Sequence, residues 1–197
     1  MTGPVPYPHE APPTGASAAL AADLRAQLPR LETPRCILRA PEITDFATYR
    51  EIVMSDRAQF MVDEPLDRED AWLDFAQCVA GWLLRGHGLW TIRSRAGNKV
   101  LGFVLICMEF GDREPELGWF VTAEAEGQGY AFEAALAARD HGLAALSLPS
   151  LVSYVDPGNA RSIRLAKRLG ARRDDDAARA FDEPLLVYRH APVTVLQ

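Results

Sequence analysis

Three apolar segments joined by two glycine-containing turns occupy the middle of this chain, and they restrict its fold more than any other feature. The predicted β-strands span residues 88–94, 100–109 and 114–121. The first turn contains Gly97 and Asn98, and the second contains Gly111 and Asp112. Such pairs suit tight reversals between antiparallel neighbours. The sequence therefore predicts a three-stranded antiparallel meander.

Helical patterns flank the meander on both sides. Before it, apolar residues recur at helical spacing within residues 44–54, and Asp67 and Gly86 are predicted to cap and end a second helix. The other predicted elements are a strand over 36–38, a helix over 130–146, a strand over 151–155, a helix over 160–169 and a strand over 185–189. This order predicts an α+β domain with a mixed sheet.

Size and charge narrow the class of protein. The chain has 197 residues, which suits one domain over residues 31–197 preceded by an extension over residues 1–30. Its 21 basic and 27 acidic side chains give a net charge of −6, which argues against a general nucleic-acid partner. Apolar residues make up 48% of the chain, which is enough for a sizeable core.

The sequence also predicts the compartment of the protein. The longest apolar stretch, residues 100–108, is too short to span a bilayer, and the N-terminus lacks the basic and apolar regions of a signal peptide. Cys36, Cys78 and Cys107 fit neither a disulfide nor a zinc framework, so they are predicted to be reduced and mostly buried. We therefore expect a cytoplasmic protein with no membrane partner and no metal.

The extension is rich in proline and alanine. Five prolines lie within residues 1–15, and because proline removes backbone donors and fixes φ, this segment is predicted to be extended or disordered. The alanine-rich residues 16–28 are predicted to form a short helix. Deletion of residues 1–15 is expected to leave stability and activity nearly unchanged, because such a tail buries too little surface to offset its ordering entropy.

Two glycines separate the last strand of the meander from the next helix. Gly127 and Gly129 tolerate positive φ and let a ligand approach the backbone closely. The start of the following helix offers free N–H groups and a partial positive charge, which suit a pyrophosphate. A tight strand-to-helix turn is the structural alternative. The segment is neither a Walker loop, which needs Gly-Lys-Ser/Thr, nor a full dinucleotide fingerprint, which needs a third glycine.

Four blocks of sequence follow one another in order along the chain. They are Leu-Glu-Thr-Pro-Arg at 31–35 leading into Ile-Leu-Arg at 37–39, Glu-Leu-Gly-Trp-Phe-Val at 116–121, Gly-Gln-Gly-Tyr-Ala-Phe-Glu-Ala at 127–134, and Val-Asp-Pro-Gly-Asn-Ala-Arg-Ser at 155–162 closing with Lys-Arg-Leu-Gly at 167–170. In these blocks the chain resembles the GNAT acetyltransferase superfamily, and most of all the branch that includes ribosomal-protein N-terminal acetyltransferases. The resemblance covers residues 31–190 and implies the GNAT fold, with strands that splay apart at an acetyl-CoA site.

The resemblance also implies which residues bind acetyl-CoA. They are Phe120, Val121, Gly127, Gln128, Gly129, Tyr130, Ala131 and Asn159. Backbone amides of the glycine loop would wrap the pyrophosphate, whereas the strand end and the asparagine would contact the pantetheine arm. The chain departs from the family at Glu126, where Gln or Arg is usual, and at Ala166, where many members have a tyrosine general acid. An anion at position 126 is unfavourable beside a pyrophosphate unless it points away.

Acetyl transfer from a thioester to an amine needs a neutral amine, a polarised carbonyl and a protonated leaving thiolate. Glu116 is the predicted base, because it shares one strand face with Gly118 and Phe120, and Gly118 would leave space above that face. Two alternatives remain open: Glu109 as the base, or Glu116 as an exposed carboxylate that pairs across the sheet. Ser162 is the predicted acid or thiolate stabiliser in place of the missing tyrosine, because it lies four residues before Ala166 on the same side of the helix. Its alternative role is a hydroxyl bonded to its own helix start.

The predicted function is therefore acetyl-CoA-dependent N-acetylation, with direct transfer to a primary amine such as a protein N-terminus or a small amine. The alternative is a non-catalytic acyl-CoA-binding module with the same fold. The expected partners are acetyl-CoA and the amine acceptor, with the protein itself a monomer or a homodimer.

Overall fold

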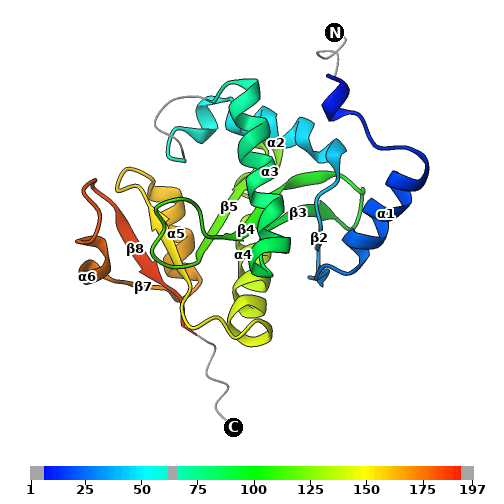
Figure 1. Cartoon of the computed structure of the whole chain (residues 1–197). Coiled ribbons are helices and arrows are strands. Elements are labelled where there is room, and N and C mark those ends of the chain that lie inside the picture. Colours follow the sequence, from blue (N-terminus) through cyan, green and yellow to red (C-terminus); the bar gives the residue numbers. More distant parts are fainter. Residues whose placement is uncertain (1–6, 62–65, 192–197) are drawn as a thin grey trace.

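The computed structural model describes residues 7–61 and 66–191, and its strands form one sheet (Figure 1). The strands are β1 (Leu31–Glu32), β2 (Cys36–Arg39), β3 (Leu89–Ser94), β4 (Val100–Cys107), β5 (Glu116–Val121), β6 (Val152–Val155), β7 (Arg172–Arg173) and β8 (Leu186–Arg189). They lie in the order β1-β2-β3-β4-β5-β6-β8-β7. All neighbours are antiparallel except β5 and β6, which are parallel. The predicted α+β class with a mixed sheet is confirmed.

Helices cover the sheet and link its halves. They are α1 (Gly15–Ala26), α2 (Phe46–Val53), α3 (Arg68–Arg85), α4 (Tyr130–Asp140), α5 (Ala160–Arg168) and α6 (Asp175–Ala178). A π-helical turn, His141–Ala145, continues α4, so the helix predicted over 130–146 is regular only in its first part. Asp67 caps α3 by accepting from the N–H groups of Glu69 and Asp70, and Gly86 ends it with φ of 76°, as predicted. The two-residue strands β1 and β7 and the one-turn helix α6 are too short to leave a periodic signal and were not predicted.

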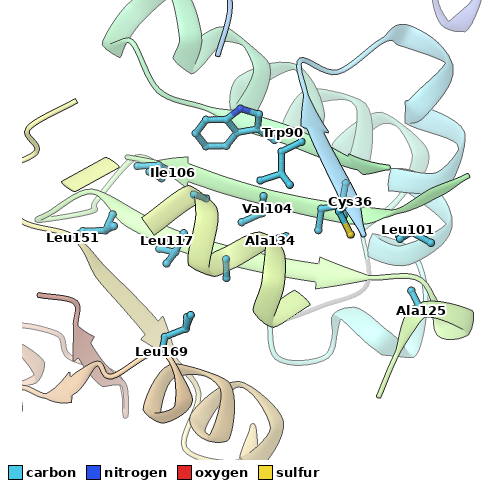
Figure 2. Close-up of a cluster of buried hydrophobic side chains, with 14 of the residues drawn as sticks. Cys36, Trp90, Leu101, Val104, Ile106, Leu117, Ala125, Ala134, Leu151 and Leu169 are labelled. Carbon is cyan, nitrogen blue, oxygen red and sulfur yellow. The ribbon is translucent and has the colours of Figure 1, made fainter. Parts of the chain in front are cut away.

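Two apolar layers lie on opposite faces of the sheet because side chains alternate along its strands. On one face, Val104, Ile106 and Leu117 pack with Ala134 of α4 (Figure 2). On the other face, Phe103 and Phe120 pack against α2 and α3. Three fully buried alanines, Ala134, Ala135 and Ala138, let α4 lie close to the sheet. The central strand β4 is therefore covered on both faces.

The two parallel strands stay together over one residue pair and then separate. Glu116 of β5 is in register with Val152 of β6, and no further pair joins these strands within the described residues. Just beyond that pair, the Ser153 hydroxyl bridges them by donating to the Leu117 carbonyl oxygen over 2.6 Å. The His190 ring nitrogen Nε2 lies 2.9 Å from the same hydroxyl. The predicted splay of the strands is thus present, and a side-chain bridge marks where it begins.

The N-terminal extension is ordered from Tyr7 onward, which corrects the prediction of a loose tail over residues 1–15. Pro8–Glu10 is a 3₁₀ turn that lies against α2 and α3. Glu10 accepts a bidentate hydrogen bond from Arg68, at 2.7 Å for each nitrogen, and a further bond from Arg50. The Glu10 carboxylate therefore pairs with two guanidinium groups of the domain, and these contacts hold the extension against α2 and α3. Residues 1–6 lie outside the described part of the chain, and α1 confirms the predicted short helix.

Two further sequence expectations bear on the rest of the molecule. Cys36, Cys78 and Cys107 are buried and free, as predicted. Within the described ranges, no helix has the length and hydropathy needed to cross a membrane.

Candidate functional site

A cleft of about 1780 Å³ runs along the gap that β5 and β6 leave open. One end lies at the glycine loop and the start of α5, and this end is named the loop end. The other end lies at the loop between β4 and β5 and at α3, and it is named the acidic end because Asp74, Glu109, Asp112 and Glu116 line it. Glu116 stands closest to the base of the splay, since it belongs to the one residue pair that joins β5 and β6.

The glycine loop presents backbone donors to the cleft. Gly127 and Gly129 have φ of 72° and 82°, so both need the left-handed conformation that glycine tolerates best. Glu133 makes the first helical bond by donating to the Gly129 carbonyl, and no side chain caps the start of α4. The first N–H groups of α4 are therefore available to an anion, and the helix dipole adds to their effect.

A brace on the far side holds this loop in shape. The Arg35 guanidinium donates from Nε to Glu133 over 2.7 Å and from Nη1 to the Gln128 carbonyl oxygen over 3.0 Å. It also lies 4.5 Å from the centre of the Tyr130 ring. Of the predicted loop residues, Gly127, Gly129 and Ala131 line the cleft, whereas Gln128 and Tyr130 do not. The bracing role of Arg35 could not be predicted from the sequence, because its partner Glu133 lies 98 residues away.

The peptide N–H and C=O groups of β5 point alternately toward the neighbouring strand β4 and into the gap. Thr122, just past β5, donates its N–H to Leu101 of β4, whereas the Leu117 and Val121 carbonyls accept bonds from the gap side, from Ser153 and Arg57. Successive peptide groups of a strand point in opposite directions, so Trp119 also directs its N–H and C=O into the gap.

This alternation corrects one expected contact. The Phe120 peptide groups point to β4 and are not free to pair with a pantetheine arm. Phe120 contributes its buried ring to the cleft wall instead. The backbone N–H and C=O groups of Trp119 and Val121 face the gap. Trp119 was not among the predicted residues, because the family motif does not indicate which strand residues turn their peptide groups toward the gap.

The start of α5 brings the two predicted residues Asn159 and Ser162 to the cleft. The Asn159 side-chain oxygen accepts the Ser162 backbone N–H over 3.1 Å, so the asparagine caps the helix. Its amide nitrogen remains free for another partner. Ala166 is fully buried beside Val155 and Tyr188 and does not line the cleft. The position that matches the family tyrosine therefore faces the core in this chain.

Glu116 is half-buried at the base of the splay, where it lines the cleft. Its Oε1 accepts the backbone N–H of Tyr154 over 3.3 Å, a donor that the separating strands leave without a ladder partner. Burial raises the pKa of Glu116 to about 8, and the charges of Asp112 and Glu109 add to the effect. The side chain is half-buried and bonds to the Tyr154 backbone N–H, a geometry that disagrees with the alternative of an exposed carboxylate paired across the sheet. The space expected above Gly118 is partly taken by Leu105, which a Cβ at that glycine would meet at 3.2 Å.

Other acids complete the acidic end. Burial raises the pKa of Glu109 to about 7, with contributions from Asp74 and Asp112. The Tyr49 hydroxyl donates to Asp74 over 2.7 Å. Ligand atoms of Asp74, Cys78 and Glu109 lie within 4.8 Å of one another, a spacing that suits a cation. However, a hydrogen bond with Cys107, together with burial, raises the pKa of the Cys78 thiol, and a protonated thiol is a poor metal ligand.

Glu126, the residue that departs from the family pattern, is paired with two arginines. Its Oε2 lies 2.7 Å from Nη2 of Arg57, and its Oε1 pairs with Nη1 of Arg161. The hydrogen bond from Arg57 holds the pKa of Glu126 below its ordinary value, so the carboxylate is ionised at neutral pH. The unfavourable charge expected at position 126 is thus compensated by cations from two other segments.

Comparisons with known proteins agree with this geometry. The family model described as "Acetyltransferase (GNAT) domain" matches residues 35–172. The uncharacterized N-acetyltransferase YnaD of Bacillus subtilis is 31% identical over 144 residues, which cover 73% of this chain and 83% of YnaD. An acetyltransferase structure from Agrobacterium tumefaciens is 38% identical with a TM-score of 0.79, covering 84% of this chain and 95% of its own.

More distant structures share the fold alone. The spermidine N-acetyltransferase from Vibrio cholerae, in complex with CoA and spermine, is 17% identical with a TM-score of 0.64 and covers 80% of this chain and 94% of its own. Ribosomal-protein acetyltransferases also occur among the structural neighbours. The match of the family model over most of the chain, the relatives above 30% identity and the splayed sheet agree with one another. The chain is an acetyltransferase that belongs to the GNAT family.

Proposed function

We propose that this protein moves the acetyl group of acetyl-CoA directly to a primary amine, with Glu116 as the general base. One observation carries the proposal: a half-buried carboxyl with a pKa of about 8 lies at the base of the splay, in the same cleft as the uncapped start of α4. The start of α4 offers donors for a diphosphate at the loop end, and Glu116 offers a proton acceptor at the acidic end.

Glu116 would take the proton that the acceptor amine must lose. The amine nitrogen then bonds to the acetyl carbon, the carbon–sulfur bond breaks, and the departing thiolate needs a proton. Ser162, on the first turn of α5, is the proposed donor of that proton, and water from the open cleft returns a proton to the serine oxygen. Backbone N–H groups that face the gap, such as that of Trp119, would stabilise negative charge on the carbonyl oxygen.

The acidic end favours an acceptor that arrives with positive charge. An α-amine with a pKa near 8 costs only about 1 kcal/mol to deprotonate at neutral pH, whereas a lysine-like amine costs about 4 kcal/mol. A base with a pKa of about 8 is matched to the first kind of amine. A protein N-terminus fits both the charge and the pKa, whereas a small polyamine fits the charge alone, and both acceptors remain within the proposal.

The experiment measures acetyl-CoA binding by calorimetry and thiol release with a panel of amines. The panel contains a peptide with a free N-terminus, a lysine peptide blocked at its N-terminus, a polyamine and an aminoglycoside. We expect binding without amine and thiol release above the blank with at least one amine. Binding with no release for any amine would favour the non-catalytic acyl-CoA-binding module, and absence of binding would overturn both.

Gly129→Val is the matched loss-of-site variant. Its φ of 82° is strained for a β-branched residue, and a Cβ at this position would lie 3.4 Å from Nη2 of Arg35, the residue that braces the loop. We expect binding of acetyl-CoA to fall below detection, while circular dichroism checks that the variant is folded. A folded Gly129→Val that binds like the parent would show that the glycine loop is only a turn.

A further inference from the structure

We infer that Arg57 and Arg161 are phosphate-binding residues for CoA, and that Glu126 is an internal anion that competes with the ligand for them. The inference rests on the proposed function, because it concerns the same cleft. It assigns a role to the residue at which this chain departs from its family, and it predicts that removing that residue's charge improves binding.

The three residues meet from three different segments. Arg57 belongs to the 3₁₀ turn Asp56–Ala58, Glu126 immediately precedes Gly127, and Arg161 is in the first turn of α5. All three line the cleft at the loop end. Arg57 also donates to the Val121 carbonyl oxygen over 3.2 Å, which ties the turn to the end of β5. The arginines therefore flank the amides that would hold a diphosphate.

The charges at this end are incompletely balanced. Glu126 supplies one negative charge to two guanidinium groups, so the triad carries one net positive charge. Arg164 and Arg168 follow on α5 and also line the cleft, with Arg168 placed 4.0 Å from the centre of the Phe132 ring. Asp56 and Asp156 also line the cleft, so the four arginines named here face three carboxylates, those of Glu126, Asp56 and Asp156. A phosphate would meet a site with more cationic groups than Glu126 neutralises.

The pairs are weak enough to exchange. The side chains of Arg57 and Glu126 are each 29% exposed, and that of Arg161 is 73% exposed. Ion pairs exposed to solvent contribute little, because water screens them and ordering long side chains costs entropy. Guanidinium–phosphate contacts are charge-assisted and often bidentate, so a diphosphate is the stronger partner for the same groups. Each binding event must nevertheless displace the Glu126 carboxylate, and this displacement lowers affinity.

The test compares Glu126→Gln with the parent by calorimetry. The probes are CoA and pantetheine, which lacks every phosphate. We expect Glu126→Gln to bind CoA about 3- to 30-fold more tightly at low salt, because the competitor is lost while its size is kept. The gain should shrink in about 1 M salt, and pantetheine should bind both proteins equally. Arg161→Gln, which removes a guanidinium paired with Glu126, should weaken CoA binding and leave pantetheine binding unaffected.

Glu124→Gln is the control for a general change in net charge. Glu124 lies two residues away, its side chain is 75% exposed, and it pairs with Lys99 outside the cleft. We expect this variant to bind CoA like the parent. Parent-like or weaker CoA binding by Glu126→Gln, or an equal gain in Glu124→Gln, would overturn the inference. A parent that binds no CoA would overturn the proposed function itself, and the two failures are therefore distinct.

Discussion

The two ends of the cleft differ in both charge and origin. The loop end comes largely from residues 126–131 and the first turn of α5, and it presents arginines and backbone N–H groups. The acidic end comes from α3, the loop after β4 and the first residue of β5, and it presents four carboxyl groups. A phosphate-bearing ligand and a cationic acceptor would therefore be drawn to opposite ends. Binding at one end and proton transfer near the other should be separable by mutation.

Glu116→Gln is expected to separate turnover from acetyl-CoA binding most strongly, because it keeps the shape of the side chain and removes its basicity. Turnover near neutral pH should fall by about 10²–10⁴-fold, while the affinity for acetyl-CoA stays the same. The carboxyl must lose its proton to act as a base, so the parent rate should rise as pH rises through about 8.

The deficit of Glu116→Gln should shrink at high pH, where the amine is already neutral. Steady-state kinetics across pH, combined with calorimetry, give both quantities. A variant with the parent's profile would contradict the assignment and point to Glu109, whose pKa of about 7 places its own transition lower.

Ser162→Ala tests whether chemistry also reaches the loop end. If the hydroxyl protonates the leaving thiolate, turnover should fall by about 10–10³-fold with little change in acetyl-CoA affinity. The free N–H groups of the α5 start share the stabilisation of negative charge, so the lower part of this range is expected. Full activity in Ser162→Ala would leave Ser162 as a residue of the helix start only.

Variants of Asn159 distinguish a ligand contact from a helix cap, because the side-chain oxygen caps α5 whereas the amide nitrogen is proposed to contact the pantetheine arm. Asn159→Asp keeps the oxygen that caps α5 and removes the amide donor, whereas Asn159→Ala removes both. Both variants should raise the KM for acetyl-CoA and spare kcat.

The alanine variant alone should lose about 1 kcal/mol of stability, measured by chemical unfolding. An unchanged KM in both variants would mean that the asparagine serves the helix and not the ligand.

The smallest effect is expected at Glu10, which lies outside the cleft but pairs with α2 and α3. Hydrogen bonding from Arg68 lowers the pKa of Glu10, so its contribution to stability is present above its ordinary pKa and is lost as pH falls through the lowered value. Glu10→Gln should lower Tm by about 2–4 °C at neutral pH.

The same variant should affect the KM of the amine more than that of acetyl-CoA, because α2 and α3 supply Tyr49 and Asp74 to the acidic end. Glu51→Gln, at an exposed position of α2, is the control. Equal changes in both KM values would show that the extension acts on stability alone.

Sequence reasoning reached the loop end because its signals are local. A few residues are enough to recognise a glycine pair between a strand and a helix, or an asparagine before a helix. The capping function of Asn159 was legible in the same way, although it was interpreted as a ligand contact. The acidic end escaped prediction apart from Glu116 and Glu109, since Asp74 and Asp112 become neighbours only when the helix and the loop pack together.

Docking of the extension was missed for the same reason. Proline density predicts the absence of regular structure in a segment by itself, but it carries no information on a partner elsewhere in the chain. The Glu10–Arg68 contact spans 58 residues, and neither residue lies in a recognisable motif. Such long-range ion pairs form only when separate segments pack against one another. The sequence predicts each segment by itself and does not predict how the segments pack.

The position of Trp119 in the cleft has a consequence for the fluorescence of the protein. All four tryptophans are described, and Trp119 is the one among them that lines the cleft, while Trp82 and Trp90 are buried edge to face at 4.5 Å. If acetyl-CoA binds in the cleft as proposed, the emission of Trp119 is expected to change on binding, whereas Trp72, Trp82 and Trp90 supply the background. Trp119→Phe, which should lose this change in fluorescence, is the control.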